Sequence, residues 1–200
     1  TGMENHAKYG DSIYFHDGDG LFVNLFIASE LAWTEKGLKV RQETRFPEEP
    51  KTTLAFAVVR PVDLALHIRI PGWIAMGGSI KINGQKLAAY SSPSSYLTVR
   101  RVWKNGDRVE VALPMEPRLE RLPDRRSVAA ILYGPIVLAG ELGGAADLTE
   151  DKVYGKYGPE GDPVPVPTFE GKNNVPLTDW IKPVAGKPLT FQTVNAGKPN

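Results

Sequence analysis

Apolar residues alternate with polar residues along much of residues 20–140, and this period of two constrains the fold more than any other feature. Successive side chains of a β-strand point to opposite faces, so each alternating set predicts a strand. The sets lie at residues 38–41, 54–58 and 64–70, with Pro61 marking the connection between the last two. Residues 21–27 are apolar in both phases, which predicts a central strand covered on both sides. The 20 glycines and 17 prolines also disfavour a helix-rich fold.

Two Asn-Gly pairs predict tight turns between strands. The pair at 83–84 separates residues 80–82 from 85–87. It predicts a type I′ hairpin, because both turn residues must accept positive φ. The pair at 105–106 predicts a second hairpin, between strands at residues 97–103 and 109–113.

The first strand of that second hairpin changes phase along its length. Leu97 and Val99 share one phase and Val102 has the other. One extra residue in a strand produces such a change, so we expect a β-bulge near Arg100 and Arg101.

Further strands are expected at residues 128–132 and 136–139, separated by Tyr-Gly-Pro. Strands about every 8–12 residues, with turn signals between them, are typical of all-β folds. We therefore predict an antiparallel, jelly-roll-like β-sandwich over residues 16–142. Residues 143–188 hold seven glycines and seven prolines, which predicts a long loop. Within residues 143–200, the apolar far end is expected to dock back or to begin a second small β domain.

The first 15 residues contain the best helix candidate. Thr1 and Glu4 have the spacing of a capping box, and Met3, Ala7 and Tyr14 follow at helical spacing. We expect this helix to end before the turn at residues 16–20. The chain begins without Met or a signal peptide, so we expect it to be part of a longer protein.

Composition excludes several classes of function. The 24 basic and 23 acidic residues leave a net charge of +1, which argues against a nucleic-acid binder. No apolar run approaches the roughly 18 residues that a membrane span needs. The absence of cysteine excludes a disulfide framework, a thiolate zinc site and a cysteine nucleophile within these residues. We therefore expect no cofactor, no metal site and no catalytic residue in this chain.

Histidines and one acidic turn are the candidate metal ligands. His6, His16 and His67 show no HxH or HxxxH spacing, and His67 lies in the polar phase of its strand. A surface or interface histidine is therefore the favoured interpretation of His67. Residues 17–20 (DGDG) resemble the opening of a calcium loop, but the position of its bidentate Glu falls at Ala28. A plain turn is favoured there.

Carboxylates and tryptophans are the candidate sugar-handling groups. Glycosidases use paired carboxylates, and the chain offers Glu48 beside Glu49 and Glu116 near Glu120. Neither pair stands out from exposed background charge, and residues 116–126 are typical of a solvated segment. The four tryptophans, at positions 33, 73, 103 and 180, could form a sugar-stacking platform. Burial in a core or a domain interface is the favoured interpretation.

Several segments resemble the glycoside hydrolase family 127 and 146 group, the β-L-arabinofuranosidases, which were first defined as a domain-of-unknown-function family. The most specific is residues 1–14 (TGMENHAKYGDSIY). The resemblance continues through residues 21–27 (LFVNLFI), 29–31 (SEL), 69–73 (RIPGW), 132–135 (LYGP) and 187–191 (KPLTF).

The resemblance implies a catalytic (α/α)6 barrel followed by β-sandwich domains. It implies a zinc ion held by cysteines and a glutamate, with one zinc-bound cysteine as the nucleophile of a retaining mechanism. The cysteine pair of that group precedes the segment that opens this chain, so no catalytic or zinc-binding position maps onto these residues. Residues 1–15 would then be the last barrel helix, and Glu4 and His6 are the candidates for a substrate rim. The parent is expected to be a periplasmic or secreted bacterial enzyme.

We therefore expect a non-catalytic accessory β-sandwich that braces an upstream barrel acting on plant arabinose-containing glycans. One alternative is an independent carbohydrate-binding module that binds arabinose-containing oligosaccharides through exposed tryptophans. Another is a sandwich that binds proteins and makes no sugar contact.

Overall fold

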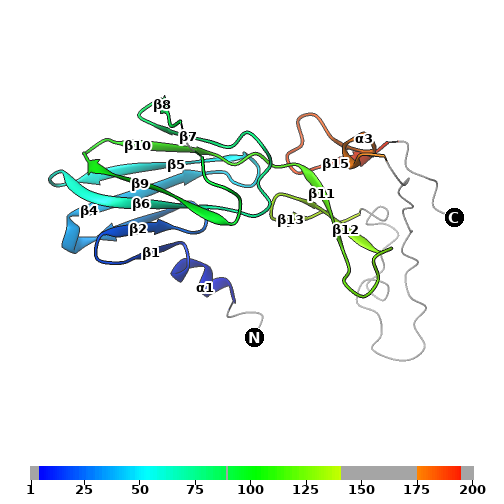
Figure 1. Ribbon diagram of the computed structural model, residues 1–200, viewed down its shortest axis with the longest axis horizontal. Coiled ribbons are helices and arrows are strands. Elements are labelled where there is room, and N and C mark those ends of the chain that lie inside the picture. The colour runs from blue at the N-terminus through cyan, green and yellow to red at the C-terminus, as the bar shows by residue number, and fades with distance from the viewer. Residues whose placement is uncertain (1–4, 89, 141–174, 195–200) are drawn as a thin grey trace. The chain divides into compact units, whose positions relative to one another are not determined.

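The computed structural model of the chain describes residues 5–88, 90–140 and 175–194. These residues are mostly strand with little helix, which confirms the all-β prediction (Figure 1). These described residues divide into two compact units, the first lying within residues 5–116 and 133–135 and the second within residues 117–132, 136–140 and 175–194. Within the described residues, no helix is both long and apolar enough to cross a membrane.

The first unit contains two β-sheets. One has the strand order β1 (Tyr14–His16), β2 (Gly20–Val23), β6 (Val62–Ile70), β9 (Ser95–Trp103). The other has the order β3 (Ser29–Trp33), β4 (Leu38–Thr44), β5 (Lys51–Val58), β10 (Arg108–Ala112), β7 (Ser79–Ile82), β8 (Gln85–Lys86). A 3₁₀ turn, η1 (Thr34–Lys36), joins β3 to β4. Inward side chains from both sheets form one hydrophobic core, and this strand order does not show a jelly roll.

The prediction of a purely antiparallel sandwich is wrong at one place, because β2 and β6 are parallel. The chain leaves the first sheet after β2, builds β3, β4 and β5 in the second sheet and then returns as β6. Each connection reverses the chain direction, so three intervening strands bring β6 back parallel to β2. Local periodicity predicts where strands lie, but it does not indicate which sheet a strand joins or whether it pairs parallel or antiparallel.

The core is built by the alternation that the sequence shows. On β6, Leu64, Leu66, Ile68 and Ile70 are buried, whereas His67 lies in the outward phase. Side chains of the two sheets meet face to face where Phe56 of β5 and Trp103 of β9 stack, with ring centroids 4.3 Å apart. The Trp103 indole Nε1 donates a hydrogen bond to the Leu64 carbonyl at 3.1 Å. The one polar atom of this indole therefore has a partner inside the core.

Of the two hairpins predicted from the Asn-Gly pairs, the structure contains one. Asn83 and Gly84 have φ values of 51° and 81°, and β7 pairs with β8, which confirms the predicted type I′ hairpin. The predicted second hairpin is wrong, because β9 pairs with β6 in one sheet and β10 pairs with β5 and β7 in the other. Asn105 and Gly106 turn the chain from one layer to the next. An alternating pattern fits a hairpin and such an arch equally well, since both bury one face of each strand.

The predicted bulge near Arg100 and Arg101 is also wrong. The β6–β9 register runs without interruption from Val62 opposite Trp103 to Ile70 opposite Ser95. Val102 lies on the outer face and is half exposed. Arg101 occupies the inward phase, where its guanidinium carbon lies 5.2 Å from the centroid of the Trp103 ring. An outward valine beside an inward arginine produced the apparent change of phase.

The N-terminal helix ends earlier than expected. Helix α1 (Asn5–Asp11) ends before Tyr14, which is the first residue of β1 and not part of a helical face. Ile13 is buried, and its carbonyl accepts a hydrogen bond from the Asn24 amide at 2.9 Å. This contact fixes the chain beside β2. The strand predicted for residues 21–27 ends at Val23.

The second unit contains two small sheets. One has the order β11 (Pro117–Arg121), β12 (Ala129–Tyr133), β13 (Ile136–Val137), and the other pairs β14 (Ile181–Pro183) with β15 (Phe191–Thr193). A short helix, α3 (Leu177–Trp180), precedes β14 and lies against β11. The C-terminal half of β11 is exposed, as the charge pattern predicts. Residues 143–188 were predicted to be a long loop, and of these residues 143–174 lie outside the described residues.

Candidate functional site

The two residues proposed for a substrate rim are only partly covered by the structure. Glu4 lies outside the described residues, and His6 lies in α1, where only the backbone is described. Their role stays a prediction. His16 lies 4.5 Å from Trp33 between ring centroids, and His67 stacks on Phe22. Across the described residues, no three His, Asp or Glu side chains come together as a group that could hold a metal ion.

The acidic segment at residues 17–20 is a turn. The Asp17 carboxylate oxygen Oδ1 accepts hydrogen bonds from the backbone amides of Gly20 at 2.7 Å and of Asp19 at 3.3 Å. An aspartate that bonds its own backbone two or three residues on is the usual chemistry of such turns. The plain-turn interpretation is confirmed.

Neither carboxylate pair is arranged for acid–base chemistry. Arg45 contacts Glu48 at 2.8 Å and Glu49 at 3.4 Å, and Lys51 contacts Glu49 at 3.1 Å, all near the surface. Glu116 and Glu120 are both exposed. Exposed carboxylates, alone or in surface ion pairs, are ordinary solvated side chains, so neither pair stands out as an acid and a base.

The tryptophans are core and packing residues. Trp33 and Trp103 are buried in the sandwich. Trp73 is partly buried and stacks on Phe46, with ring centroids 5.7 Å apart, and Trp180 is partly buried in the second unit. This result confirms the core interpretation for Trp33 and Trp103 and leaves no fully exposed indole for a sugar-stacking platform.

A row of aromatic side chains crosses the outer face of the four-stranded sheet, and we call it the aromatic ridge. It consists of Phe15, Phe22, His67 and Tyr96. Phe15 pairs with Phe22 across β1 and β2, and Phe22 pairs with His67 across β2 and β6. The rings of Phe22 and His67 stack at 4.2 Å and 11°, while Tyr96 meets Phe22 edge-on at 5.7 Å. Phe15 and Tyr96 remain 49% and 41% exposed.

Polar contacts fix the orientation of the ridge. The His67 ring nitrogen Nδ1 lies 2.8 Å from the Thr98 hydroxyl, and the Tyr96 hydroxyl donates to the Asn24 side-chain oxygen at 2.8 Å. Gly20 makes room for the imidazole, because a Cβ at this position would lie 2.9 Å from His67 Nε2. The rings are therefore held in place before any partner binds.

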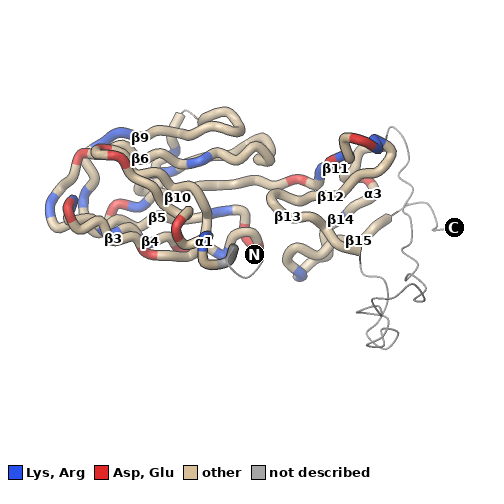
Figure 2. Tube along the Cα trace, turned by 90° about the horizontal axis from the view of Figure 1, so that it is seen from below, with Lys and Arg blue, Asp and Glu red and all other residues tan. Residues whose placement is uncertain are grey.

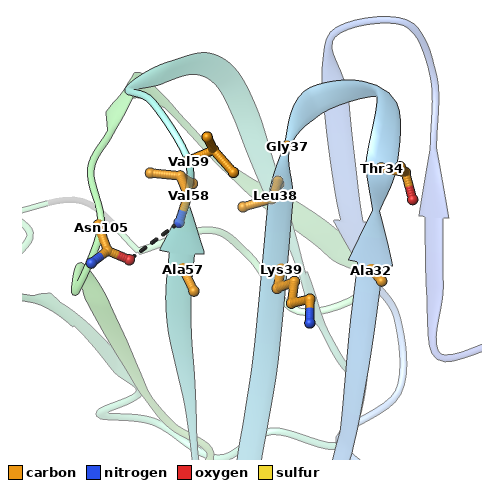
Figure 3. A pocket seen from close by; sticks show the side chains of 9 residues that line it. All are labelled: Ala32, Thr34, Gly37, Leu38, Lys39, Ala57, Val58, Val59 and Asn105. Carbon is orange, nitrogen blue, oxygen red and sulfur yellow. Dashed lines mark hydrogen bonds between the residues drawn. The ribbon is translucent and has the colours of Figure 1, made fainter.

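A second feature is an open depression of about 440 Å³ at the ends of β3, β4 and β5 (Figure 3). Its lining is mostly aliphatic and contains neither a carboxylate nor a histidine. The Asn105 side-chain oxygen at its rim accepts a hydrogen bond from the Val58 amide at 3.3 Å, which helps to close the end of the sandwich. Nothing in the depression supplies catalytic chemistry.

Residues 20–115 match the family model for the middle domain of glycoside hydrolase family 127 (GH127), the β-L-arabinofuranosidases. The chain is similar to the solved structure of a GH127 β-L-arabinofuranosidase from Geobacillus stearothermophilus T6, with 31% identity, coverage of 66% of this chain and 22% of that chain, and a TM-score of 0.58. The solved structure of a glycoside hydrolase shares 28% identity, covers 62% of this chain and 22% of its own chain, and has a TM-score of 0.56. The solved structure of a GH127 β-arabinofuranosidase shares 28% identity, covers 62% of this chain and 23% of its own chain, and has a TM-score of 0.54.

A search of curated proteins found no match. This chain spans less than a quarter of the length of the solved chains that it resembles. The matched residues begin at β2 and run to the end of the two-sheet unit, so the family match and the sandwich coincide. Residues 20–115 therefore match the middle β domain of the GH127 family.

Proposed function

We propose that this chain is a non-catalytic supporting region of a β-L-arabinofuranosidase that acts on arabinose-containing glycans. The observation that carries the proposal is the match of the two-sheet unit to the GH127 middle domain. The similarity to the solved structure of a β-L-arabinofuranosidase supports the substrate class. The role of the sandwich is then to brace the catalytic domain of the same enzyme.

The side chains present also favour a supporting role. The zinc site implied by the resemblance to this family needs thiolate ligands, and the chain has no cysteine. No group of imidazoles and carboxylates replaces them among the residues that the structure describes. These residues therefore do not fit a zinc-thiolate centre, and we assign the zinc and the nucleophile to the catalytic domain.

An independent carbohydrate-binding module is the weaker alternative. Sugar-binding sheets present flat aromatic faces to the ligand, whereas Phe22 and His67 cover one another's faces and all four tryptophans are at least partly buried. Titration of tryptophan fluorescence with arabino-oligosaccharides should therefore leave the emission of the chain unchanged. Saturable quenching would favour the binding module.

Catalysis is tested by comparing two polypeptides, this chain and a longer form that also contains the preceding domain. We expect this chain to fold without metal, to bind no stoichiometric zinc and to show no turnover of an aryl β-L-arabinofuranoside. The longer form should contain zinc and hydrolyse the substrate. Turnover by this chain alone would overturn the proposal, and Glu4, Glu48 and Glu116 would then be the first residues to substitute.

A further inference from the structure

The two outer faces of the sandwich differ in character. The outer face of the six-stranded sheet carries charged residues, and the Glu43 carboxylate contacts Arg108 at 2.7 Å and Arg41 at 3.8 Å. Figure 2 marks where basic and acidic residues lie along the chain. Lys39, Lys81 and Glu110 lie in the same outward phase of their strands and extend this charged surface. Such a face is stable in water.

The outer face of the four-stranded sheet instead carries the aromatic ridge. Polar and charged residues lie around the ridge on the same face: Arg69 is opposite Tyr96, and the Asp63–Arg100 ion pair, with its charged atoms 3.6 Å apart, lies farther along β6 and β9. Aromatic residues are enriched in the cores of protein interfaces, where charged residues are depleted. An exposed, contiguous apolar patch with polar groups around it marks an interaction surface.

We propose that the aromatic ridge is the surface on which the catalytic domain of the same enzyme docks. This inference rests on the proposed function and adds to it the face that makes the contact. The ridge is suited to a protein surface because its rings stand side by side across the strands. They present edges and the exposed parts of Phe15 and Tyr96, which can fill hollows between apolar side chains.

Topology favours the preceding domain as the occupant. The matched family is a middle domain, so in that family further chain lies before it and after it. The chain enters the sandwich through β1 and β2, which form one edge of the four-stranded sheet and carry Phe15 and Phe22 (Figure 1). Helix α1 ends only three residues before the start of β1. A domain that precedes the sandwich is therefore tethered beside the ridge, where its effective concentration is high.

Hydroxyl-radical footprinting tests this contact without changing any residue. The labelling rates of Phe15 and Tyr96 are measured in this chain and in the longer enzyme that contains the preceding domain. We expect at least a fivefold lower rate for both residues in the longer enzyme. Val59 is 90% exposed and lines the depression at the ends of β3, β4 and β5, so it serves as an internal control with an unchanged rate.

The outcomes separate this inference from the proposed function. Equal labelling of Phe15 and Tyr96 in the two proteins would refute docking on the ridge, even if the longer enzyme hydrolyses arabinofuranosides. Protection of the ridge in an enzyme without that activity would support the docking and refute the proposed function. Low labelling rates of Phe15 and Tyr96 already in this chain alone, together with a dimeric mass in analytical ultracentrifugation, would show that a second copy occupies the ridge. That result would also refute the inference.

Discussion

Asp107 links the two Asn-Gly turns of the sandwich, and it offers the sharpest test of how this fold is stabilised. The side chain is only 6% exposed. One carboxylate oxygen accepts a hydrogen bond from the Asn83 side-chain amide at 2.8 Å, and the other accepts one from the Lys104 backbone amide at 2.9 Å. The Arg101 guanidinium lies 3.7 Å away, and the Asn83 oxygen accepts from the Arg108 amide at 2.8 Å.

We expect Asp107→Asn to lower the free energy of unfolding by about 2–4 kcal/mol at pH 7. A hydrogen bond to a charged group contributes about 1.5–3 kcal/mol, and the two bonds here are not independent. The substitution keeps the shape of the side chain but replaces one acceptor oxygen with a donor nitrogen. Either Asn83 or the Lys104 amide then faces another donor in a buried position.

The same carboxylate predicts a pH dependence. Burial by itself raises the pKa of Asp107, but the hydrogen bonds from Asn83 and Lys104 and the charge of Arg101 outweigh burial, so the pKa is lowered. A folded-state pKa below the unfolded value of about 3.9 means that the stabilisation is complete above that pH. It is lost as the pH falls through the folded-state pKa. The difference in the free energy of unfolding between wild type and Asp107→Asn should therefore be constant from neutral pH to about pH 5. It should shrink below about pH 4.

Urea unfolding followed by tryptophan fluorescence between pH 3 and 7 measures this difference. Asp63→Asn is the matched control, because Asp63 makes an exposed ion pair with Arg100 at 3.6 Å. Exposed ion pairs contribute at most about 1 kcal/mol, so this control should lose little stability. A loss for Asp107→Asn no larger than for Asp63→Asn at pH 7, or a loss that persists undiminished at pH 3, would refute the reasoning.

Four further predictions follow from single contacts. Trp73→Ala should lower the free energy of unfolding by about 2–3 kcal/mol, below the full core value because Trp73 is only partly buried, and thermal unfolding would show this loss as a lower midpoint. Burial raises the pKa of Tyr90 to about 12, so absorbance titration at alkaline pH should show a tyrosinate that forms only at about pH 12; the absence of such a late step would contradict this prediction. Gly84→Ala should cost about 1 kcal/mol in urea unfolding because Gly84 has a φ of 81°, and an unchanged stability would contradict the turn geometry. The amides of α1, a helix of seven residues, should exchange rapidly while those of β6 are protected, and slow exchange of both would show that α1 packs firmly on the sandwich.

Periodicity predicted the strands well because each buries one face in the same core. The alternation at residues 38–41, 54–58 and 64–70 became β4, β5 and β6, with the predicted side chains inside. Pairing between distant strands was harder to predict. The parallel β2–β6 pair and the arch at residues 105–106 depend on which sheet each strand joins, and the local pattern is the same for either choice.

The candidate docking surface could not have been predicted from the sequence for the same reason. Phe15, Phe22, His67 and Tyr96 come from four strands and become neighbours only through their pairing register. The available signals were weak: residues 21–27 are apolar in both phases, and His67 lies in the polar phase of its strand. The surface interpretation of His67 agrees with its position on the outer face, where it bonds Thr98 at 2.8 Å.

The most direct test of the supporting role is to remove the middle domain from the longer enzyme. Turnover of an aryl β-L-arabinofuranoside and its half-life on heating would be compared between the longer enzyme and a form that lacks residues 20–115. We predict at least a tenfold shorter half-life of activity without the sandwich, because the apolar surface of the catalytic domain that contacts the ridge would be left exposed to water. An equal half-life and an equal turnover in the two forms would contradict a supporting role for this domain.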